Sequence, residues 1–208
     1  MYLSLLKLNP RSRKAVVEAF RPYELHRSLM RAFPKRECDG PGRVLVRLDM
    51  DREDSGMSLL VQSENKPDWT ALSSVADFLL EEPKCKHLEP TFSPGQLLYF
   101  RLRANPTVKR NGKRLGIIRE NDQIDWLNRK GEEGGFNVVS VTVMSEGIAR
   151  DKMTDSAQSG HDLSLLSVRF EGVLRVVEAM VFRRTLECGI GSGKGLGFGL
   201  LSVAPIRS

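Results

Sequence analysis

The stretch that decides the fold is SPGQLLYFRLRANP, residues 93–106. In it, apolar side chains alternate with Tyr99, Arg101 and Arg103, which is the pattern of a strand buried on one face. A Ser-Pro-Gly turn signal precedes this strand. Because a new strand starts here near the middle of the chain, we predict two units, divided between residues 93 and 94.

Residues 1–93 are predicted to follow the order β-α-β-β-α-β. Alternation marks the strands, and apolar residues at helical spacing mark the helices. The expected elements are a strand over 2–8, a helix that Ser12 caps and that runs through Phe20, a helix that begins at Pro22 and ends before Pro34, strands at 44–49 and 59–62, a helix over 69–79 that Asp68 caps, and a short strand near 86–92.

Residues 94–208 are predicted to follow the same order, although the two halves share no sequence repeat. The expected elements are a strand over 98–104, a basic loop at 105–114, a helix over 120–130, a strand over 136–144, a loop or mobile hairpin at 145–162, strands at 165–170 and 173–177 joined by a turn at Glu171-Gly172, a helix over 178–188 that Gly189 ends, and a strand over 200–204. These patterns indicate an α+β fold of two tandem ferredoxin-like (RRM-like) domains, 1–93 and 94–208, each a four-stranded antiparallel sheet backed by helices.

The composition of the 208 residues argues against several classes of protein. Hydrophobic residues make up 40%, yet no run of about 18 apolar residues occurs, so no membrane-spanning helix is expected. The chain starts apolar and then turns basic, the reverse of a secretory signal, which favours a cytoplasmic protein. Cys38, Cys85 and Cys188 are too few and too far apart for a disulfide framework or a zinc ribbon, and we expect three reduced thiols.

The net charge of +6 comes from two segments. Residues 1–36 contain nine Lys or Arg and two acidic residues, and residues 101–114 contain six and none. If folding brings these segments together, they form a positive surface suited to a phosphate backbone. If it does not, they are two separate solvated faces, and charge alone leaves both possibilities open.

The helix that begins at Pro22 carries the first candidate site. Tyr23 and His26 are three residues apart and therefore neighbours on one flank, while Arg27 and Arg31 continue the polar side. An imidazole can take or give a proton near neutral pH, and a guanidinium can hold a phosphate. The alternative is a polar helix face on which His26 has no function.

The second candidate is the run GIGSGKGLGFG, residues 189–199, with glycine at every second position. Its Gly-Lys pair lacks the earlier glycine and the following Ser or Thr of a P-loop, and no GxGxxG occurs, so no nucleotide cofactor is expected. What remains is a backbone that can approach a phosphate chain closely, or else a glycine-rich packing loop. The candidate contacts are Gly191, Ser192, Gly193, Lys194 and Gly195.

Residues 101–114 are the third candidate, because they have the highest density of basic residues and contain no aromatic residue. That combination favours binding to a nucleic-acid duplex or backbone over stacking on bases. The cations are Arg101, Arg103, Lys109, Arg110, Lys113 and Arg114. No two histidines are spaced at i, i+4 and no convergent set of carboxylates is marked, so no metal site is predicted.

Six segments, taken in order, resemble the CasE (also called Cse3) family, the subunit of the type I-E Cascade complex that processes CRISPR RNA. They are MYLSLLKLNP (1–10), YELHRSL (23–29), PGQLLYFRLRANP (94–106), QIDWLNRK (123–130), VRFEGVLRV (168–176) and GIGSGKGLGFGLLSVAP (189–205). The resemblance therefore spans nearly the whole chain.

This resemblance implies two ferredoxin-like domains and a metal-independent endoribonuclease that uses no cofactor. Such enzymes cut CRISPR precursor RNA at the base of the repeat stem-loop. Attack by a 2′-hydroxyl leaves a 2′,3′-cyclic or 3′-phosphate and a 5′-hydroxyl, and the enzyme then keeps the mature crRNA and joins other Cascade subunits. Tyr23 and His26 match the catalytic pair of the family, with the acid and the base left unassigned.

The resemblance also implies RNA contacts outside that pair. Arg31 matches a basic position of the family that faces RNA, and the glycine run matches the RNA-contacting loop of the family. Segment 145–162 departs from the strongly basic hairpin of the family, because aspartates accompany its two cations, Arg150 and Lys152, which stay RNA-binding candidates. The alternative function is a non-catalytic subunit that binds structured RNA through the same basic surface.

Overall fold

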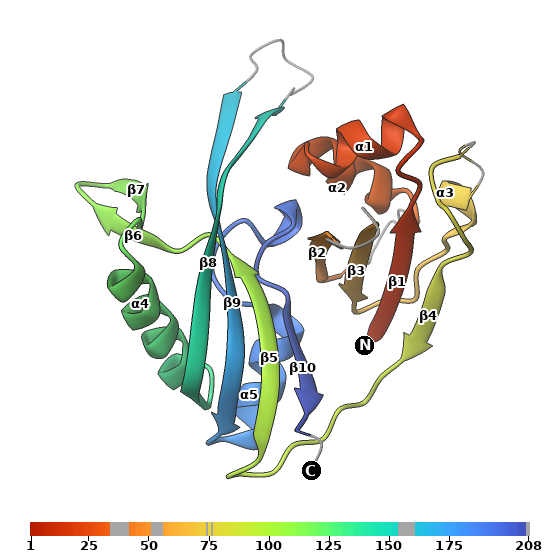
Figure 1. The fold of residues 1–208 in the computed structure, drawn as a ribbon. Helices are drawn as coiled ribbons and strands as arrows, with labels where there is room; N and C mark the ends of the chain where they lie inside the picture. Colours follow the sequence, from red (N-terminus) through yellow and green to blue (C-terminus); the bar gives the residue numbers. More distant parts are fainter. Residues whose placement is uncertain (34–41, 51–55, 74, 76, 154–160, 207–208) are drawn as a thin grey trace. The chain divides into compact units, whose positions relative to one another are not determined.

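A computed structural model describes residues 1–33, 42–50, 56–73, 75, 77–153 and 161–206 (Figure 1). The chain divides into two compact units. The first comprises residues 1–89, 149–164 and 195–197, and the second comprises residues 90–148, 165–194 and 198–208. Two stretches from the later half of the chain thus belong to the first unit, and the division after residue 93 into independent domains stays a prediction.

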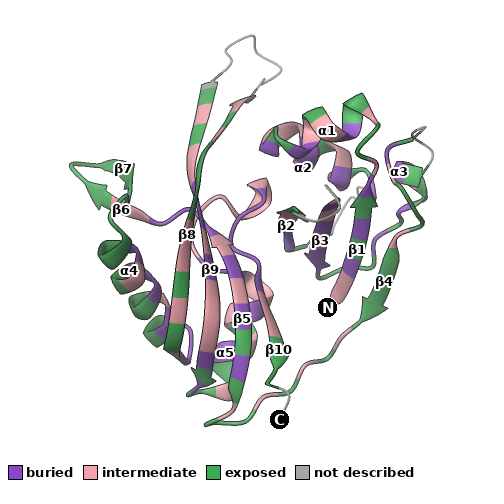
Figure 2. Cartoon of the chain, viewed as in Figure 1, coloured by how far each residue is buried: buried purple, intermediate pink, exposed green. Residues whose placement is uncertain are grey.

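The first unit is built on an antiparallel four-stranded sheet in the order β2-β3-β1-β4. Its elements are β1 (Tyr2–Leu8), α1 (Arg13–Ala19), α2 (Pro22–Met30), β2 (Val44–Met50), β3 (Met57–Ser63), α3 (Thr70–Ser73) and β4 (Lys84–His87). Leu6 and Leu59 of the sheet and Leu25 and Leu29 of α2 meet in one core. Figure 2 shows buried stretches on β1, β3 and α2. Burial of each such side chain contributes about 1.5–3 kcal/mol, which holds α2 on this unit.

The second unit has a sheet in the order β10-β5-β9-β8. The elements from β5 onward are β5 (Leu97–Ala104), β6 (Thr107–Arg110), β7 (Lys113–Gly116), α4 (Glu120–Glu133), β8 (Phe136–Met153), β9 (His161–Val176), α5 (Ala179–Cys188), the 3-10 turn η1 (Lys194–Leu196) and β10 (Leu201–Pro205). All of them lie in the second unit except residues 149–153 of β8, 161–164 of β9 and 195–196 of η1, which belong to the first. Trp126 of α4 and Phe182 of α5 share a core with Leu102 and Phe170 of the sheet. In both units the fourth strand lies beside the first, and the third lies between the first and the second. The predicted fold of two ferredoxin-like units is confirmed.

Local chemistry explains where several helices begin and end. The Ser12 hydroxyl accepts a hydrogen bond from the Ala15 amide at 3.4 Å, which starts α1 as predicted. Pro22 occupies the first turn of α2, where its missing N–H leaves no intrahelical bond unmade. Gly189 follows α5 with a φ of 73°, a left-handed conformation that glycine adopts without a steric penalty.

Two predictions for the first unit are wrong in extent. The helix over 69–79 is reduced to the four residues of α3, since Asp77 has a φ of 57° and Leu79 forms a bridge with Leu8 instead. Both features oppose a right-handed helix in the described residues of this stretch, and residues 74 and 76 lie outside the description. The last strand is β4, which ends at His87 rather than near residue 92.

Two predictions for the second unit are wrong, and a third is decided between its two alternatives. The basic loop at 105–114 is largely the hairpin β6–β7. The predicted turn at Glu171-Gly172 does not exist, because strand β9 continues through both residues. A Cβ at Gly172 would lie 2.0 Å from the Ser140 carbonyl oxygen of β8. This glycine therefore serves a close approach of two strands rather than a turn. Of the loop and the mobile hairpin predicted for segment 145–162, the described residues form the two arms of a hairpin, because they extend the neighbouring strands β8 and β9. Residues 154–160 lie outside the described residues.

No helix in the described part of the chain is long and apolar enough to cross a membrane. Cys85 is an exposed free thiol and Cys188 a half-buried one, as the sequence predicts. Cys38 lies outside the described residues.

Candidate functional site

Helix α2 turns an apolar face to the core and keeps a polar flank at its edge. Leu25 and Leu29 are 5% and 1% exposed. Tyr23 and His26, one turn apart, are both half-buried. The four-residue recurrence of leucine thus anchors the helix and sets the phenol and the imidazole at the margin of the core, where they are partly shielded from water.

Burial lowers the pKa of His26 below its usual 6.5, because water stabilises the charged imidazolium less when the ring is partly desolvated. Neither ring nitrogen has a hydrogen-bond partner among the residues that the structure describes. His26 is therefore a neutral base near pH 7, with its lone pair available to a hydroxyl group.

The glycine run meets His26 at Gly195. A methyl group added to Gly195 would lie 3.6 Å from His26 Cε1 and 3.8 Å from Nδ1, within the first compact unit. The absence of a side chain at this position keeps one side of the imidazole clear. Both the histidine and the glycine are candidates predicted from the sequence, and they lie close together in the first unit.

Strand β8 also reaches α2. The backbone N–H of Tyr23 donates a hydrogen bond of 2.7 Å to Oδ2 of Asp151. Next to it, the exposed Arg150 lines a cavity of about 680 Å³ together with Arg21 and Glu24. Lys152 belongs to β8, but its side chain lies outside the description.

The two arginines predicted on α2 differ in their surroundings. Arg27 is exposed, and its guanidinium pairs with the Glu24 carboxylate at 3.1 Å, one turn earlier in the helix. Arg31 follows the last turn of α2 and is exposed. A phosphate would have to displace Glu24 from Arg27, whereas Arg31 has no ion pair with a described residue.

The basic segment after β5 forms an exposed two-stranded ribbon. Asn111 and Gly112 have φ values of 49° and 75°, as a two-residue hairpin turn requires. Lys109 pairs with Arg114 and Arg110 pairs with Lys113 in the register, so each pair of cations shares one face of the ribbon. All four side chains are exposed. The Asn-Gly pair was the signal that could have predicted this hairpin.

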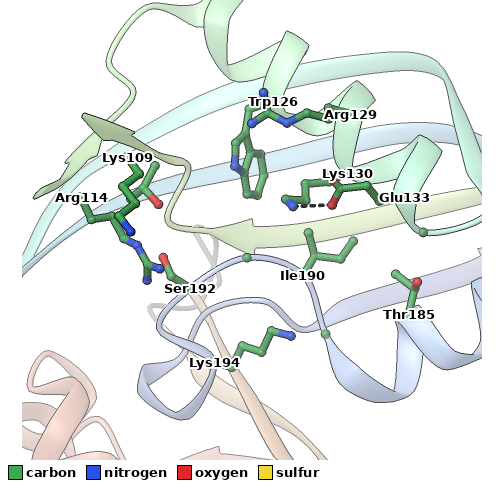
Figure 3. Close-up of a pocket in the computed structure, with 14 residues that line it drawn as sticks. Lys109, Arg114, Trp126, Arg129, Lys130, Glu133, Thr185, Ile190, Ser192 and Lys194 are labelled. Carbon is green, nitrogen blue, oxygen red and sulfur yellow. Dashed lines mark hydrogen bonds and ion pairs between the residues drawn. The ribbon is translucent and has the colours of Figure 1, made fainter. Parts of the chain in front are cut away.

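One face of this ribbon lines a cleft in the second unit, with a volume of about 510 Å³ (Figure 3). Its cationic lining residues are Lys109, Arg114, Arg129, Lys130 and Lys194. The one carboxylate among the lining residues is Glu133, which pairs with Lys130 one turn away on α4. Arg129 and Lys130 were not predicted from the sequence, although both belong to the motif QIDWLNRK.

Most of the glycine run is shaped by packing. Gly191 has a φ of 82°, and a Cβ there would lie 3.1 Å from the Trp126 ring. Gly193 has a φ of 75° and lies against Phe198. The Ser192 hydroxyl donates to the Asn105 carbonyl at 3.3 Å. Gly191 and Gly193 therefore serve packing within the protein, whereas Gly195 is the glycine of the run that lies next to His26.

Two predicted cations have structural partners inside the second unit. Lys194 donates from Nζ to the Cys188 carbonyl at 2.9 Å, which places a positive charge at the C-terminus of α5. Arg103 forms an ion pair of 2.7 Å with Glu146 and lies 4.9 Å from the centre of the Phe198 ring.

Arg101 likewise forms an ion pair of 2.6 Å with Glu171. Arg169 lies between the two glutamates, at 3.6 Å from Glu146 and 3.7 Å from Glu171. Arg101 and Arg103 thus belong to an ion-pair network that spans β5, β8 and β9, and their role in RNA binding stays a prediction.

Among the residues that the structure describes, no group of three or more His, Cys, Asp or Glu side chains is arranged to hold a metal ion. His87 lies elsewhere, on β4 and tilted against the Tyr2 ring, with ring centres 5.0 Å apart. It has no part in the site at α2.

The chain matches known proteins along almost its whole length. A sequence model of a family described as CRISPR associated protein matches residues 1–205. The CRISPR-associated endoribonuclease Cse3 of Thermus thermophilus is 38% identical over 99% of this chain and 100% of its own. The Cascade subunit CasE of Escherichia coli is 34% identical over 88% of this chain and 92% of its own.

Solved structures also match this chain along almost its whole length. A structure of Cse3 bound to a 19-nucleotide RNA has a TM-score of 0.87 and 36% identity, and it covers 99% of this chain and 100% of its own. Cas6e from Escherichia coli has a TM-score of 0.69 and 29% identity, with 99% and 100% covered. The chain therefore belongs to the family of CRISPR-associated proteins that contains Cse3 and CasE.

Proposed function

We propose that this protein is a metal-independent endoribonuclease that cuts CRISPR precursor RNA at the base of the repeat stem-loop. The observation that carries the proposal is a half-buried imidazole with a lowered pKa, His26, beside the tyrosine of the same helix flank. The support from relatives is the name of the 38% identical Cse3, an endoribonuclease, and the description of one solved Cse3 structure as a pre-cleavage complex with RNA.

The proposed reaction uses the RNA as its own nucleophile. The neutral His26 takes the proton of a 2′-hydroxyl, whose oxygen then forms a bond to the adjacent phosphorus. The bond from phosphorus to the 5′-oxygen breaks, and that oxygen takes up a proton. The products are a 2′,3′-cyclic phosphate, which can open to a 3′-phosphate, and a 5′-hydroxyl. Tyr23 orients the imidazole or supplies the second proton. Acid–base help of this kind contributes about 10²–10⁴ in rate.

Binding and chemistry are assigned to different parts of the chain. The exposed cations of the β6–β7 hairpin, and the exposed Arg129 in the cleft beside it, are suited to the phosphates of an RNA stem. We expect the protein to keep the mature crRNA and to join other subunits, as the name of CasE, a Cascade subunit, suggests. We also expect it to act in the cytoplasm, with no cofactor.

The decisive test incubates the pure protein with synthetic repeat RNA, with and without excess EDTA. His26→Ala should lower the single-turnover cleavage rate at saturating protein by about 10²-fold or more, with affinity within a few-fold of wild type. Tyr23→Phe removes only the hydroxyl and should cause a smaller loss. Analysis of the product ends should find a 5′-hydroxyl. Loss of wild-type cleavage in EDTA, or full activity of His26→Ala, would contradict the proposal.

The second candidate is a non-catalytic subunit that binds structured RNA. The exposed cations of the β6–β7 hairpin favour it, because they would serve binding whether or not His26 transfers a proton. Pure protein that binds the repeat tightly and leaves it uncut would establish this candidate in place of the first.

A further inference from the structure

The carboxylate of Asp151 is the cap of helix α2. The N-cap residue itself, Arg21, makes no side-chain hydrogen bond to the helix start, and Pro22 has no N–H to offer. The next amide, that of Tyr23, donates to Asp151 Oδ2 at 2.7 Å. The acceptor comes from a residue 128 positions along the chain, near the end of β8. Helix caps usually come from a residue next to the helix in the sequence, whereas this cap comes from a distant strand.

This bond reaches the candidate site directly. Tyr23 is both the donor of the bond and one of the two proposed catalytic residues, and His26 follows one turn later on the same rigid helix. Asp151 is half-buried, so the bond is partly shielded from water. A negative charge at a helix start is also favoured by the dipole of the helix. The first turn of α2 is therefore joined to the end of β8 by a hydrogen bond.

Resting on the function proposed above, we propose that Asp151 is a positioning residue for cleavage. Its carboxylate holds the first turn of α2 so that Tyr23 and His26 face the scissile phosphate in the reactive geometry. Its strand also carries Arg150 and Lys152, the RNA-binding candidates, so contact of RNA with this part of β8 is coupled to the position of the catalytic helix.

In the sequence, Asp151 is one of the aspartates that make segment 145–162 less basic than the hairpin of the family. In the structure, its carboxylate instead bonds to the helix that carries Tyr23 and His26. Misplacement of reacting groups by about 1 Å lowers rates on the order of 10²-fold, so loss of a single positioning bond can affect the chemistry without affecting affinity.

The test compares full-length variants at position 151 in single-turnover cleavage of a synthetic repeat hairpin, at saturating protein and well below the melting temperature of every variant. Asp151→Leu keeps the branch at Cγ but cannot accept the bond, and it should cut about 10–10²-fold more slowly, with affinity nearly unchanged. Asp151→Asn keeps an acceptor oxygen and should recover most of the rate. Asp162→Asn is the control, because it removes an equal charge from an exposed residue of the same cavity.

Calorimetry of the same variants separates positioning from mere stability. If Asp151→Leu melts earlier but cuts at the wild-type rate, the bond is structural only and the inference fails. Equal rates for Asp151→Asn and Asp151→Leu also overturn it. In both cases wild-type cleavage and its loss in His26→Ala would still stand, so the failure would be distinct from failure of the proposed function.

Discussion

Helix α2 and the β6–β7 hairpin both present polar side chains that we assign to RNA, but the two regions differ in burial. Tyr23 and His26 on α2 are half-buried, whereas the four cations of the hairpin are exposed. Partial burial changes the proton affinity of an imidazole, and exposure keeps a cation free to replace counterions on a phosphate backbone. The difference indicates that α2 is suited to chemistry and the hairpin to affinity.

A second contrast lies within the segment 101–114. Its first two arginines, on β5, are held by Glu171 and Glu146 on the face of a sheet. Its last four cations extend into solvent on the ribbon. Residues that are equivalent as sequence are thus divided between a structural network and a surface available to a ligand.

The largest effect should come from replacing Lys109, Arg110, Lys113 and Arg114 together by glutamine. Affinity for the repeat RNA should fall by about 10²-fold or more, and the slope of log affinity against log salt should become shallower by roughly one for each phosphate that the variant no longer binds. The cleavage rate at saturating protein should not change. Titration of labelled RNA at several salt concentrations measures both quantities.

The matched control is Arg101→Gln combined with Arg103→Gln, compared with Arg110→Gln combined with Lys113→Gln. Each pair removes two cations. The first pair leaves two glutamates without their closest partners and should lower the melting temperature by several degrees, while the second should mainly weaken RNA binding. A salt slope that responds equally to both pairs would contradict the division of the segment.

The pH dependence of cleavage should reveal the shifted imidazole. If the neutral His26 accepts the proton, the saturating rate should hold at pH 6.5 and fall about tenfold per pH unit only below the lowered pKa. A rate that instead falls as pH rises above that pKa would make His26 the proton donor. Single-turnover rates over a pH series decide whether His26 accepts or donates the proton.

The same shift has a consequence for folding. The unfolded chain binds a proton at His26 more readily than the native protein does, so this group makes the free energy of unfolding decrease as pH falls below 6.5 and has no effect above it. His26→Gln should remove that part of the dependence. Calorimetry of both proteins over about pH 5–7 measures the difference.

The smallest effect separates two glycines of one run. Gly191→Ala should lower the free energy of unfolding by about 1–2 kcal/mol, because position 191 has a left-handed φ and lies close to Trp126. Gly195→Ala meets only ordinary contact distances and should leave the melting temperature unchanged, but its methyl group lies against His26 and should slow cleavage. Identical melting and cleavage behaviour of the two variants would contradict this assignment.

Much of the fold could be predicted because alternation and helical spacing are local properties. The strand at residues 2–8 and the helices that begin after Ser12 and at Pro22 lie where the patterns indicate. Some predictions failed where a local signal was given the wrong structural role. Gly172 looks like a turn and permits a close strand contact, and the Asn-Gly pair at 111–112 makes a hairpin within a segment that we predicted as a loop.

The sequence by itself determined the order of the elements and the residue types of the site, since hydrophobic periodicity and the spacing of Tyr23 and His26 are written in the chain. Only the tertiary structure decided which groups surround them. The approach of Gly195 to His26, the bond from Tyr23 to Asp151 and the pairing of Arg103 with Glu146 join residues more than 40 positions apart. Such contacts depend on how packed strands and helices place their side chains, and no local pattern contains that information.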